Sequence, residues 1–179
     1  MAHAPSGPAV EIRRLSGPAL TDQLGALAGI LADCVEGGAS IGFMPPFGVE
    51  DARAVFEAAA EEVEAGRRLL LGAFLEGKLV GTVQVVLSLP PNQPHRGDIT
   101  KLLTHRTARN RGIARLLMER AEDEARSEHK TLLVLDTCEG SVAERLYTRL
   151  GWNRVGVIPG FALYPDGSIC DTVVFWKNL

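Results

Sequence analysis

The chain has 179 residues, of which 46% are hydrophobic and 23% are charged, and its formal net charge is −3. This composition is typical of a globular protein that is long enough to bury a core. The negative charge argues against a protein that mainly coats nucleic acid or an anionic membrane, and no apolar run is long enough to cross a bilayer.

The beginning of the chain and its cysteines predict a cellular compartment. MAHAPSGP lacks the apolar core of a signal peptide, so we expect a flexible tail at residues 1–8 and one domain over residues 9–179. The three cysteines, Cys34, Cys138 and Cys170, form no CxxC pair and have no metal-ligand spacing to the histidines. The sequence therefore predicts a reduced, cytoplasmic chain without structural disulfides and without metal.

Strands and helices alternate in the first half of the chain. AVEIRRL predicts a strand, and TDQLGALAGILADCVEG predicts a helix with Thr21 as its N-cap and Gly37–Gly38 at its end. The loop GGASIGFMPPFG leads to a second helix from about residue 50 to residue 65. Two apolar strands then flank Glu76–Gly77, which is typical of a hairpin.

The second half continues the alternation. GDITKLLTH predicts a strand, a helix begins near Gly112, and TLLVLD predicts the next strand. SVAERLYTRL is a helix with a capping box of Ser141 and Glu144 and an end at Gly151, and WNRVGVIP and TVVFWK follow as strands separated by a loop. This order predicts an α/β (α+β) fold: a single mixed central β-sheet of about six or seven strands with helices on both faces.

The densest basic stretch surrounds the start of the helix near Gly112. Between Ile99 and Met118 there is no acidic residue, whereas five basic residues fall there: Lys101, Arg106, Arg109, Arg111 and Arg115. The first turn of a helix leaves N–H groups without partners, and a glycine lets the backbone approach a phosphate closely. The stretch predicts a pyrophosphate site, with a solvated basic helix start as the alternative. Neither a GxxxxGK[ST] nor a GxGxxG motif is present.

Two motifs in their order along the chain resemble those of a known superfamily. The hexamer from Arg109 to Ala114 fits R/Q-x-x-G-x-G/A, and GSVAERLYTRLGW contains a spaced alanine, Tyr147 and a closing glycine–tryptophan pair. Over about residues 9–179 the chain resembles the GNAT superfamily of N-acetyltransferases. Gly140 departs from the pattern, because many members have an asparagine there.

The resemblance implies the GNAT acyl-CoA N-acyltransferase fold, acetyl-CoA as the acyl donor and no metal. It also implies that one backbone N–H in the strand before the loop faces the thioester oxygen. The residues implied to bind acetyl-CoA are Leu102, Leu103, Thr104, Arg109, Asn110, Arg111, Gly112, Ile113, Ala114 and Arg115.

Acetyl transfer to an amine requires a base for the amine, stabilisation of an oxyanion and a proton for the leaving thiolate. The resemblance favours Tyr147 as the acid, and the alternative is a core tyrosine. Asp136 and Asp98 are both candidates for the base or for binding a cationic substrate, against the alternatives of a turn-forming residue and a solvated strand start. His105 is interpreted as a loop residue. Cys138 is a weaker candidate for an acyl-accepting nucleophile, since no histidine is placed to activate it.

The loop GGASIGFMPPFG, together with LDTCEGSVAERLY and PGFALYPDGS, resembles the acetyltransferases related to the tabtoxin-resistance protein. This resemblance implies a pocket for a small, amino-acid-like amine, with toxins or antibiotics among the candidate substrates. Gly38, Ser40, Phe43 and Met44 are its predicted substrate-binding residues, with Phe43 and Met44 in an exposed lid. The alternative is a helix connection with two buried anchors.

We expect a small-molecule amine as the partner, neither nucleic acid nor membrane, and a monomer or homodimer. Two other functions stay open at this point. One is a non-catalytic acyl-CoA-binding sensor, and the other is a protein or peptide N-acetyltransferase.

Overall fold

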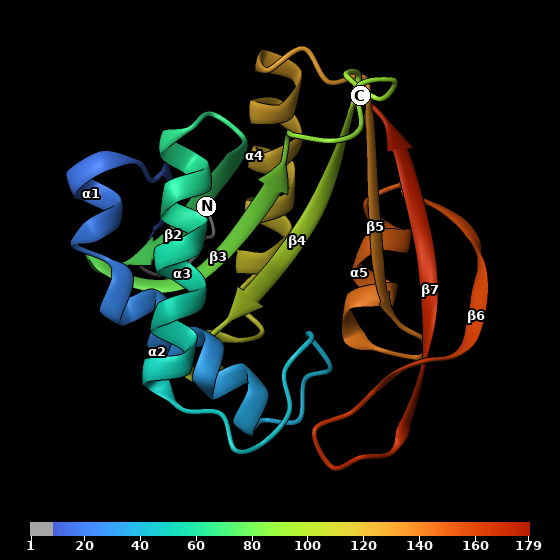
Figure 1. Cartoon of the computed structure of the whole chain (residues 1–179), viewed down its shortest axis with the longest axis horizontal. Coiled ribbons are helices and arrows are strands. Elements are labelled where there is room, and N and C mark those ends of the chain that lie inside the picture. Colours follow the sequence, from blue (N-terminus) through green and yellow to red (C-terminus); the bar gives the residue numbers. More distant parts are fainter. Residues whose placement is uncertain (1–8) are drawn as a thin grey trace, which may run out of the picture.

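The computed structural model describes residues 9–179, so the predicted tail at residues 1–8 lies outside the described residues. Seven strands form one sheet in the order β1-β2-β3-β4-β5-β7-β6 (Figure 1). Neighbouring strands are antiparallel except for β4 and β5, which are parallel. The strands are β1 (Val10–Arg14), β2 (Arg68–Leu75), β3 (Lys78–Val86), β4 (Arg96–Thr104), β5 (Leu132–Cys138), β6 (Asn153–Leu163) and β7 (Ile169–Asn178).

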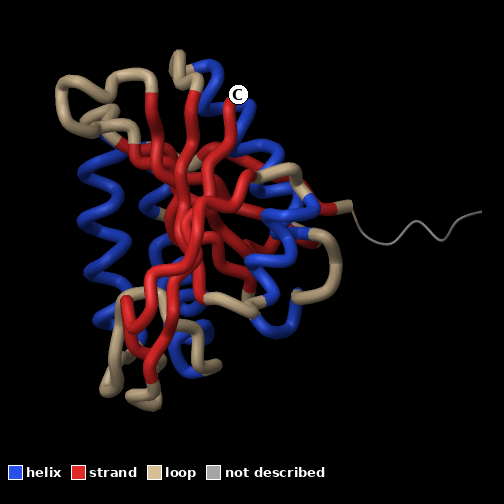
Figure 2. The backbone as a smooth tube through the Cα atoms, turned by 90° about the vertical axis from the view of Figure 1, so that its right-hand side faces the viewer, coloured by secondary structure: helices blue, strands red, loops and turns tan. Residues whose placement is uncertain are grey.

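Helices cover both faces of the sheet (Figure 2). One face carries α1, α2 and α3, and the other carries α4 and α5. The helices are α1 (Gly17–Thr21), α2 (Leu24–Glu36), α3 (Val49–Glu64), the short 3₁₀ helix η1 (Arg106–Ala108), α4 (Ile113–Ser127) and α5 (Val142–Arg149). The predicted fold class is confirmed.

The two faces explain why β2 and β3 read as apolar runs rather than as alternating strands. Leu69 and Leu71 point into the core beneath α4, whereas Leu70 points into the core beneath α2 and α3. A strand covered on both sides buries every side chain, so its sequence is apolar throughout. Any polar residue inside these strands is therefore exceptional.

Several local predictions are confirmed, and two are wrong. Glu76 and Gly77 have φ angles of 50° and 76°, as a two-residue hairpin turn requires. Thr21 is not a helix N-cap: it ends the short helix α1, and α2 begins at Leu24. The predicted loop after Gly160 is largely strand, because a register shift between Ile158 and Ala162 absorbs the irregular Pro-Gly sequence within β6.

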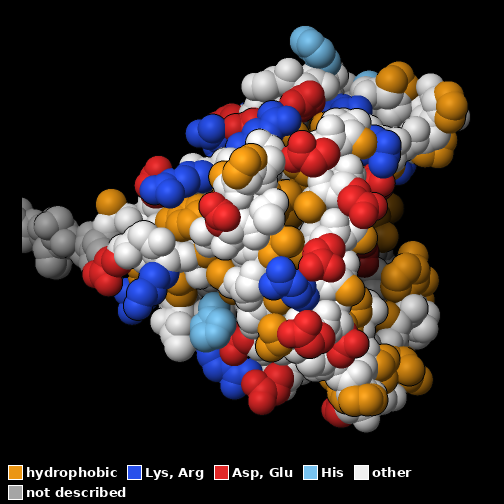
Figure 3. Space-filling model, turned by 60° about the vertical axis from the view of Figure 1, so that its left-hand side comes forward, with side chains coloured by type: hydrophobic (Ala, Val, Ile, Leu, Met, Phe, Trp, Pro, Cys, Tyr) orange, Lys and Arg blue, Asp and Glu red, His pale blue; other side chains and the backbone are white. Residues whose placement is uncertain are grey.

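The surface viewed from the side of α1 carries acidic and basic side chains that are interspersed (Figure 3). Arg14 of β1, for example, donates to Glu128 at the end of α4 (2.9 Å). Among the helices of residues 9–179, none combines the length and the hydropathy needed to cross a bilayer.

Candidate active site

The sheet opens between β4 and β5, which are parallel neighbours for only three residue pairs. Pairing runs from Arg96 with Leu132 to Asp98 with Val134, and beyond this point the strands diverge (Figure 1). A bulge follows in β4, where Lys101 has a φ angle of 51°. On the side that faces β5, the backbone N–H and C=O groups in the later half of β4 therefore have no strand partner. This half contains Leu102, Leu103 and Thr104.

The helix α4 begins beside this open edge. Gly112 caps it in the left-handed conformation with φ 75°, and Asn110 just before it has φ 62°. The first intrahelical bond runs from the Leu116 N–H to the Gly112 carbonyl (3.2 Å). The preceding N–H groups have no intrahelical acceptor, and the helix dipole adds positive potential at this end. The backbone at this end is therefore suited to bind an anion.

The basic side chains of the loop are mostly engaged with the protein itself. Arg109 donates its Nε–H to the Thr104 carbonyl (3.3 Å), and Arg115 pairs with Glu119 along α4 (2.7 Å). Lys101 belongs to β4 and not to the loop before α4, and its ammonium donates to the carbonyl of Ile41 (2.9 Å). The predicted phosphate site would thus depend on backbone N–H groups more than on the cluster of cations that the sequence suggested.

Arg106 connects the loop to α2. Its backbone N–H donates to Asp33 (2.9 Å), and its guanidinium contacts Asp33 and Glu36. Burial alone raises the pKa of Asp33, but the two hydrogen bonds from Arg106 outweigh it, and the pKa is lowered. His105 bonds to the Thr107 hydroxyl (2.9 Å), in agreement with its interpretation as a loop residue.

Tyr147 lies on α5 and is 5% exposed, between Trp152 and Phe175 with ring centroids 6.0 Å away in each case. Burial, followed by the negative charge of Asp136, raises the pKa of its phenol. The hydroxyl therefore keeps its proton at neutral pH and is available as a donor. Among the described residues, Asp136 is thus the one charged group whose electrostatic effect on the Tyr147 phenol is resolved.

Asp136 is exposed at the point where β5 departs from β4. Desolvation by the surrounding protein raises the pKa of its carboxyl, Lys101 opposes this, and Asp98 adds to it. Asp98 pairs with Arg96 (3.1 Å) and is partly buried. A carboxylate whose pKa is raised is a stronger base than an ordinary one, which favours Asp136 over Asp98 for proton removal.

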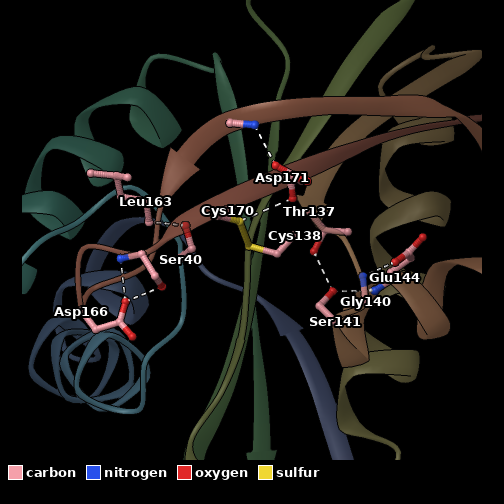
Figure 4. Close-up of a disulfide and its surroundings, with 12 residues drawn as sticks. Ser40, Thr137, Cys138, Gly140, Ser141, Glu144, Leu163, Asp166, Cys170 and Asp171 are labelled. Carbon is pink, nitrogen blue, oxygen red and sulfur yellow. Dashed lines mark hydrogen bonds between the residues drawn. A yellow bond between two sulfur atoms is a disulfide. The ribbon is translucent and has the colours of Figure 1, made fainter.

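The loop between α2 and α3 contains the four predicted substrate-binding residues. Phe43 is half-buried against Phe47 (4.5 Å between ring centroids) and is not an exposed lid residue, whereas Met44 is 45% exposed. Ser40 donates to the Leu163 carbonyl of β6 (2.7 Å, Figure 4). Gly38 lines a cavity of about 700 Å³ between this loop and the β6–β7 hairpin. The expected exposed lid is thus an anchored loop.

The absence of structural disulfides is a wrong prediction. Cys138 at the end of β5 and Cys170 at the start of β7 form a disulfide with Cα atoms 6.1 Å apart (Figure 4). Register explains the pairing, since Cys138 is opposite Thr172, two residues along from Cys170. Cys138 is therefore no free nucleophile, and Cys34 is a buried free cysteine.

The start of α5 confirms the predicted cap. The Ser141 hydroxyl accepts a hydrogen bond from the Glu144 N–H (3.0 Å). The Glu144 carboxylate reaches back and accepts from the N–H of Gly140 (2.6 Å, Figure 4). At the position of the missing asparagine, Gly140 has a φ angle of 74° and presents only its backbone.

Four polar residues near the site were missed by sequence reasoning or given another role. Gln84 lies inside the apolar strand β3, Arg68 begins the apolar strand β2, Thr100 lies in the mixed strand β4, and Lys101 was counted with the phosphate loop. A polar residue in a strand that is buried on both faces is the signal that points to them. Among the described residues, no cluster of three or more His, Cys, Asp or Glu side chains forms a metal site.

Comparison with known proteins identifies the family. The Acetyltransferase (GNAT) family matches residues 39–152, which include the open edge of β4, the start of α4 and Tyr147. The chain belongs to this family. Its members use acetyl-CoA as the acetyl donor, and the expectation of a GNAT acetyltransferase is confirmed at this level.

Solved structures share the fold. A ribosomal-protein-alanine N-acetyltransferase from Brucella melitensis is 23% identical with a TM-score of 0.79, and the match covers 94% of this chain and 99% of that one. The protein yncA from Salmonella typhimurium, solved with its cofactor acetyl-CoA, is 20% identical with a TM-score of 0.79 and coverages of 96% and 94%. A protein described as a phosphinothricin N-acetyltransferase is 18% identical with a TM-score of 0.77 and coverages of 96% and 99%. At these identities the likeness shows the fold alone, and none of them confirms the narrower resemblance to tabtoxin-resistance proteins.

Proposed function

We propose that this chain transfers the acetyl group of acetyl-CoA to the primary amine of a small molecule by direct attack in a ternary complex. The observation that carries the proposal is the place of Asp136 and Tyr147. Asp136, whose carboxyl has a raised pKa, lies on β5 just beyond the point where β4 and β5 diverge, and its charge acts on the buried, protonated phenol of Tyr147 on α5. Acetyl-CoA also needs backbone donors, for its pyrophosphate at α4 and for the amides of its arm along β4.

The residues supply each proton and charge that the reaction requires. Asp136 accepts the proton of the amine, whose nitrogen forms a bond to the thioester carbon. A free N–H of β4 between Leu102 and Thr104 donates to the oxygen on which negative charge develops. As the carbon–sulfur bond breaks, Tyr147 donates its proton to the sulfur. The raised pKa makes the phenol of Tyr147 a weaker acid than usual. The transfer therefore requires that the CoA thiolate forms in the same poorly solvated surroundings, which raise the basicity of the thiolate as well.

Two other functions are tested against this proposal. A non-catalytic acyl-CoA sensor needs the α4 site but has no use for a paired base and acid. A protein or peptide N-acetyltransferase needs an open groove, and the hydrogen bond from Ser40 to Leu163 instead anchors the loop between α2 and α3 to the β6–β7 hairpin. We therefore favour a small acceptor, including amino-acid-like toxins or antibiotics of the kind suggested by the tabtoxin-resistance resemblance.

The first experiment measures the melting temperature with acetyl-CoA, and with ATP and NAD as controls. A ligand at a hundred times its Kd stabilises the native state by about 2.7 kcal/mol, which is a shift of several degrees. A shift with acetyl-CoA alone supports the donor site. No shift, or an equal shift with ATP, would contradict the roles given to Arg109, Asn110, Arg111, Gly112, Ile113, Ala114 and Arg115.

Tyr147→Phe separates an enzyme from a sensor. The variant keeps the ring that packs between Trp152 and Phe175 and loses only the hydroxyl. We expect kcat to fall by roughly 10²–10⁴ with an unchanged acetyl-CoA melting shift. Unchanged turnover would remove Tyr147 from the mechanism.

The domain bounds, the oligomeric state and the cellular location complete the proposal. We propose one domain over residues 9–179 and a monomer or homodimer. We also propose a cytoplasmic location, although the Cys138–Cys170 disulfide removes the argument from the cysteines. Limited proteolysis, light scattering and cell fractionation test them in turn.

A further inference from the structure

A patch of polar side chains lies within the sheet on the face that α2 and α3 cover. Gln84 of β3 stands opposite Leu70 on one side and Thr100 of β4 on the other, so these residues share one face. Arg68 and Asp98 lie on the same face, because each is opposite Val86 of β3. We call Arg68, Gln84, Asp98 and Thr100 the polar patch. Leu70, which is opposite Gln84 on the same face, belongs to the apolar core beneath α2 and α3, so the polar patch interrupts an otherwise apolar surface.

The polar patch contains buried atoms that have no hydrogen-bond partner among residues 9–179. They are the donors Arg68 Nε and Gln84 Nε2, the Thr100 hydroxyl, which can donate or accept, and the acceptor Asp98 Oδ1. Gln84 is only 1% exposed, and its carbonyl oxygen already accepts from Arg68 Nη1 (2.5 Å). This bond fixes the amide so that its NH₂ group is left to donate. Buried polar groups of folded proteins are normally satisfied, so a set of free donors on one face indicates a ligand.

Two basic side chains, Lys101 and Arg68, give this region of the sheet a positive charge. Burial lowers the pKa of Lys101, the neighbouring Arg68 lowers it further, and Asp136 opposes both. Burial likewise lowers the pKa of Arg68. Lys101 also donates to Ile41 and lies 4.8 Å from the centre of the Phe43 ring, so the loop between α2 and α3 closes over it. The patch thus contains one partly buried cation, Arg68, and a second, Lys101, lies beside it, with Asp136 on the side of the proposed reaction.

We propose that the polar patch with Lys101 binds the carboxylate of an acceptor that is itself an amino acid, with its amine directed to Asp98 and Asp136. The proposal rests on the proposed function, since it names the substrate class of the same site. A carboxylate has two oxygens that together accept about four hydrogen bonds, which matches the free donors of Arg68, Gln84 and Thr100 beside the charge of Lys101. The free oxygen of Asp98 matches the N–H of an amine.

The same chemistry disfavours the other classes of amine. A polycationic amine would bring positive charge toward Arg68 and Lys101, which have little solvent to screen the repulsion. An amine without an anionic group would leave the buried donors unmatched, and a site built to hydrogen-bond a substrate strongly rejects an analogue that lacks the matching group. The carboxylate is therefore the group that determines specificity here.

The experiment compares each of a panel of L-amino acids with its own C-terminal amide, using acetyl-CoA as donor and measuring the release of free CoA. The pair differs only in the anionic group. We expect kcat/KM for at least one acid to exceed that for its amide by about tenfold or more. If acids and amides react equally well, or if only amines without a carboxylate react, the proposal is wrong while the proposed function stands. An acetyl-CoA melting shift without acetylation of any amino acid also overturns it.

Variants identify the residues that are responsible. Arg68→Met should lower kcat/KM for the acid by about tenfold or more and should lower that for the amide much less, so that the ratio of acid to amide falls. Arg67→Met is the matched control, because the adjacent Arg67 is exposed and pairs with Glu62 (2.8 Å). Thr100→Val removes one hydroxyl and keeps the shape, so it tests the patch if Arg68→Met does not fold. An unchanged acetyl-CoA melting shift in each variant confirms an intact donor site, and equal losses for acid and amide would overturn the proposal.

Discussion

At the scale of single residues, the site contains two carboxylates with different surroundings. Desolvation by the surrounding protein raises the pKa of the Asp136 carboxyl, Lys101 opposes this rise, and the charge of Asp98 adds to it. Asp98 is held by Arg96 in an ion pair (3.1 Å). The sequence left open which of them is the base. The structure favours Asp136, whose pKa is raised even though Lys101 opposes the shift, over Asp98, which forms an ion pair with Arg96.

The pH dependence of the rate tests this assignment. Activity requires ionised Asp136, so kcat/KM should fall as pH falls through its raised pKa. Asp98→Asn removes a charge that raises this pKa, so the acid limb of the profile should move to lower pH. Asp136→Asn should remove the limb and lower kcat by roughly 10²–10⁴. The opposite pattern, in which only Asp98→Asn abolishes the limb, would make Asp98 the base.

At the scale of elements, the N-terminus of α4 depends on the left-handed conformation of Gly112. Gly151 after α5 offers a matched comparison, because its φ angle is 77° against 75° for Gly112, and a Cβ atom at either position meets no atom within 4 Å. Replacing either glycine by alanine should lower the free energy of unfolding by about 1–2 kcal/mol.

Only one of these two variants should affect the donor. Gly112→Ala places a methyl group where we propose that the pyrophosphate approaches, so the Kd for acetyl-CoA should rise by about tenfold, measured by calorimetry. Gly151→Ala should leave the Kd unchanged. Equal Kd values in the two variants would show that the start of α4 does not contact the donor.

A second prediction at this scale concerns how α4 is held to β7. Glu122 of α4 is 6% exposed, accepts from the indole N–H of Trp152 (3.0 Å) and pairs with Lys177 of β7 (2.8 Å). Glu122→Ala leaves the ammonium of Lys177 poorly paired and should cost about 3–5 kcal/mol. Glu119→Ala, which removes an exposed partner of Arg115, should change stability by less than about 0.5 kcal/mol in the same urea titration. Similar losses in both would mean that the buried network contributes little.

At the scale of the whole molecule, patterns local to the chain predicted the fold well. The order of elements, the hairpin at Glu76–Gly77 and the start of α4 all follow from residues within one or two turns. The resemblance to the GNAT superfamily, rather than the local pattern, indicated Tyr147 as a candidate acid. The polar patch was not predicted because it depends on the register of three strands, which brings Arg68, Gln84 and Thr100 onto one face.

The disulfide is the second feature that depends on long-range register, and it gives the last prediction. Cys138 and Cys170 are 32 residues apart in sequence, and their bond links the end of β5 to β7 close to the turn of the β6–β7 hairpin. In the unfolded chain it closes a loop of that length, so its removal should cost about 2–4 kcal/mol, or several degrees in melting temperature. The double substitution Cys138→Ala and Cys170→Ala tests this prediction and leaves only the buried Cys34. A reductant should lower the melting temperature of the wild type but not that of this variant. Alkylation of the unreduced, unfolded wild type should modify one cysteine, and modification of three would show that the bond does not form.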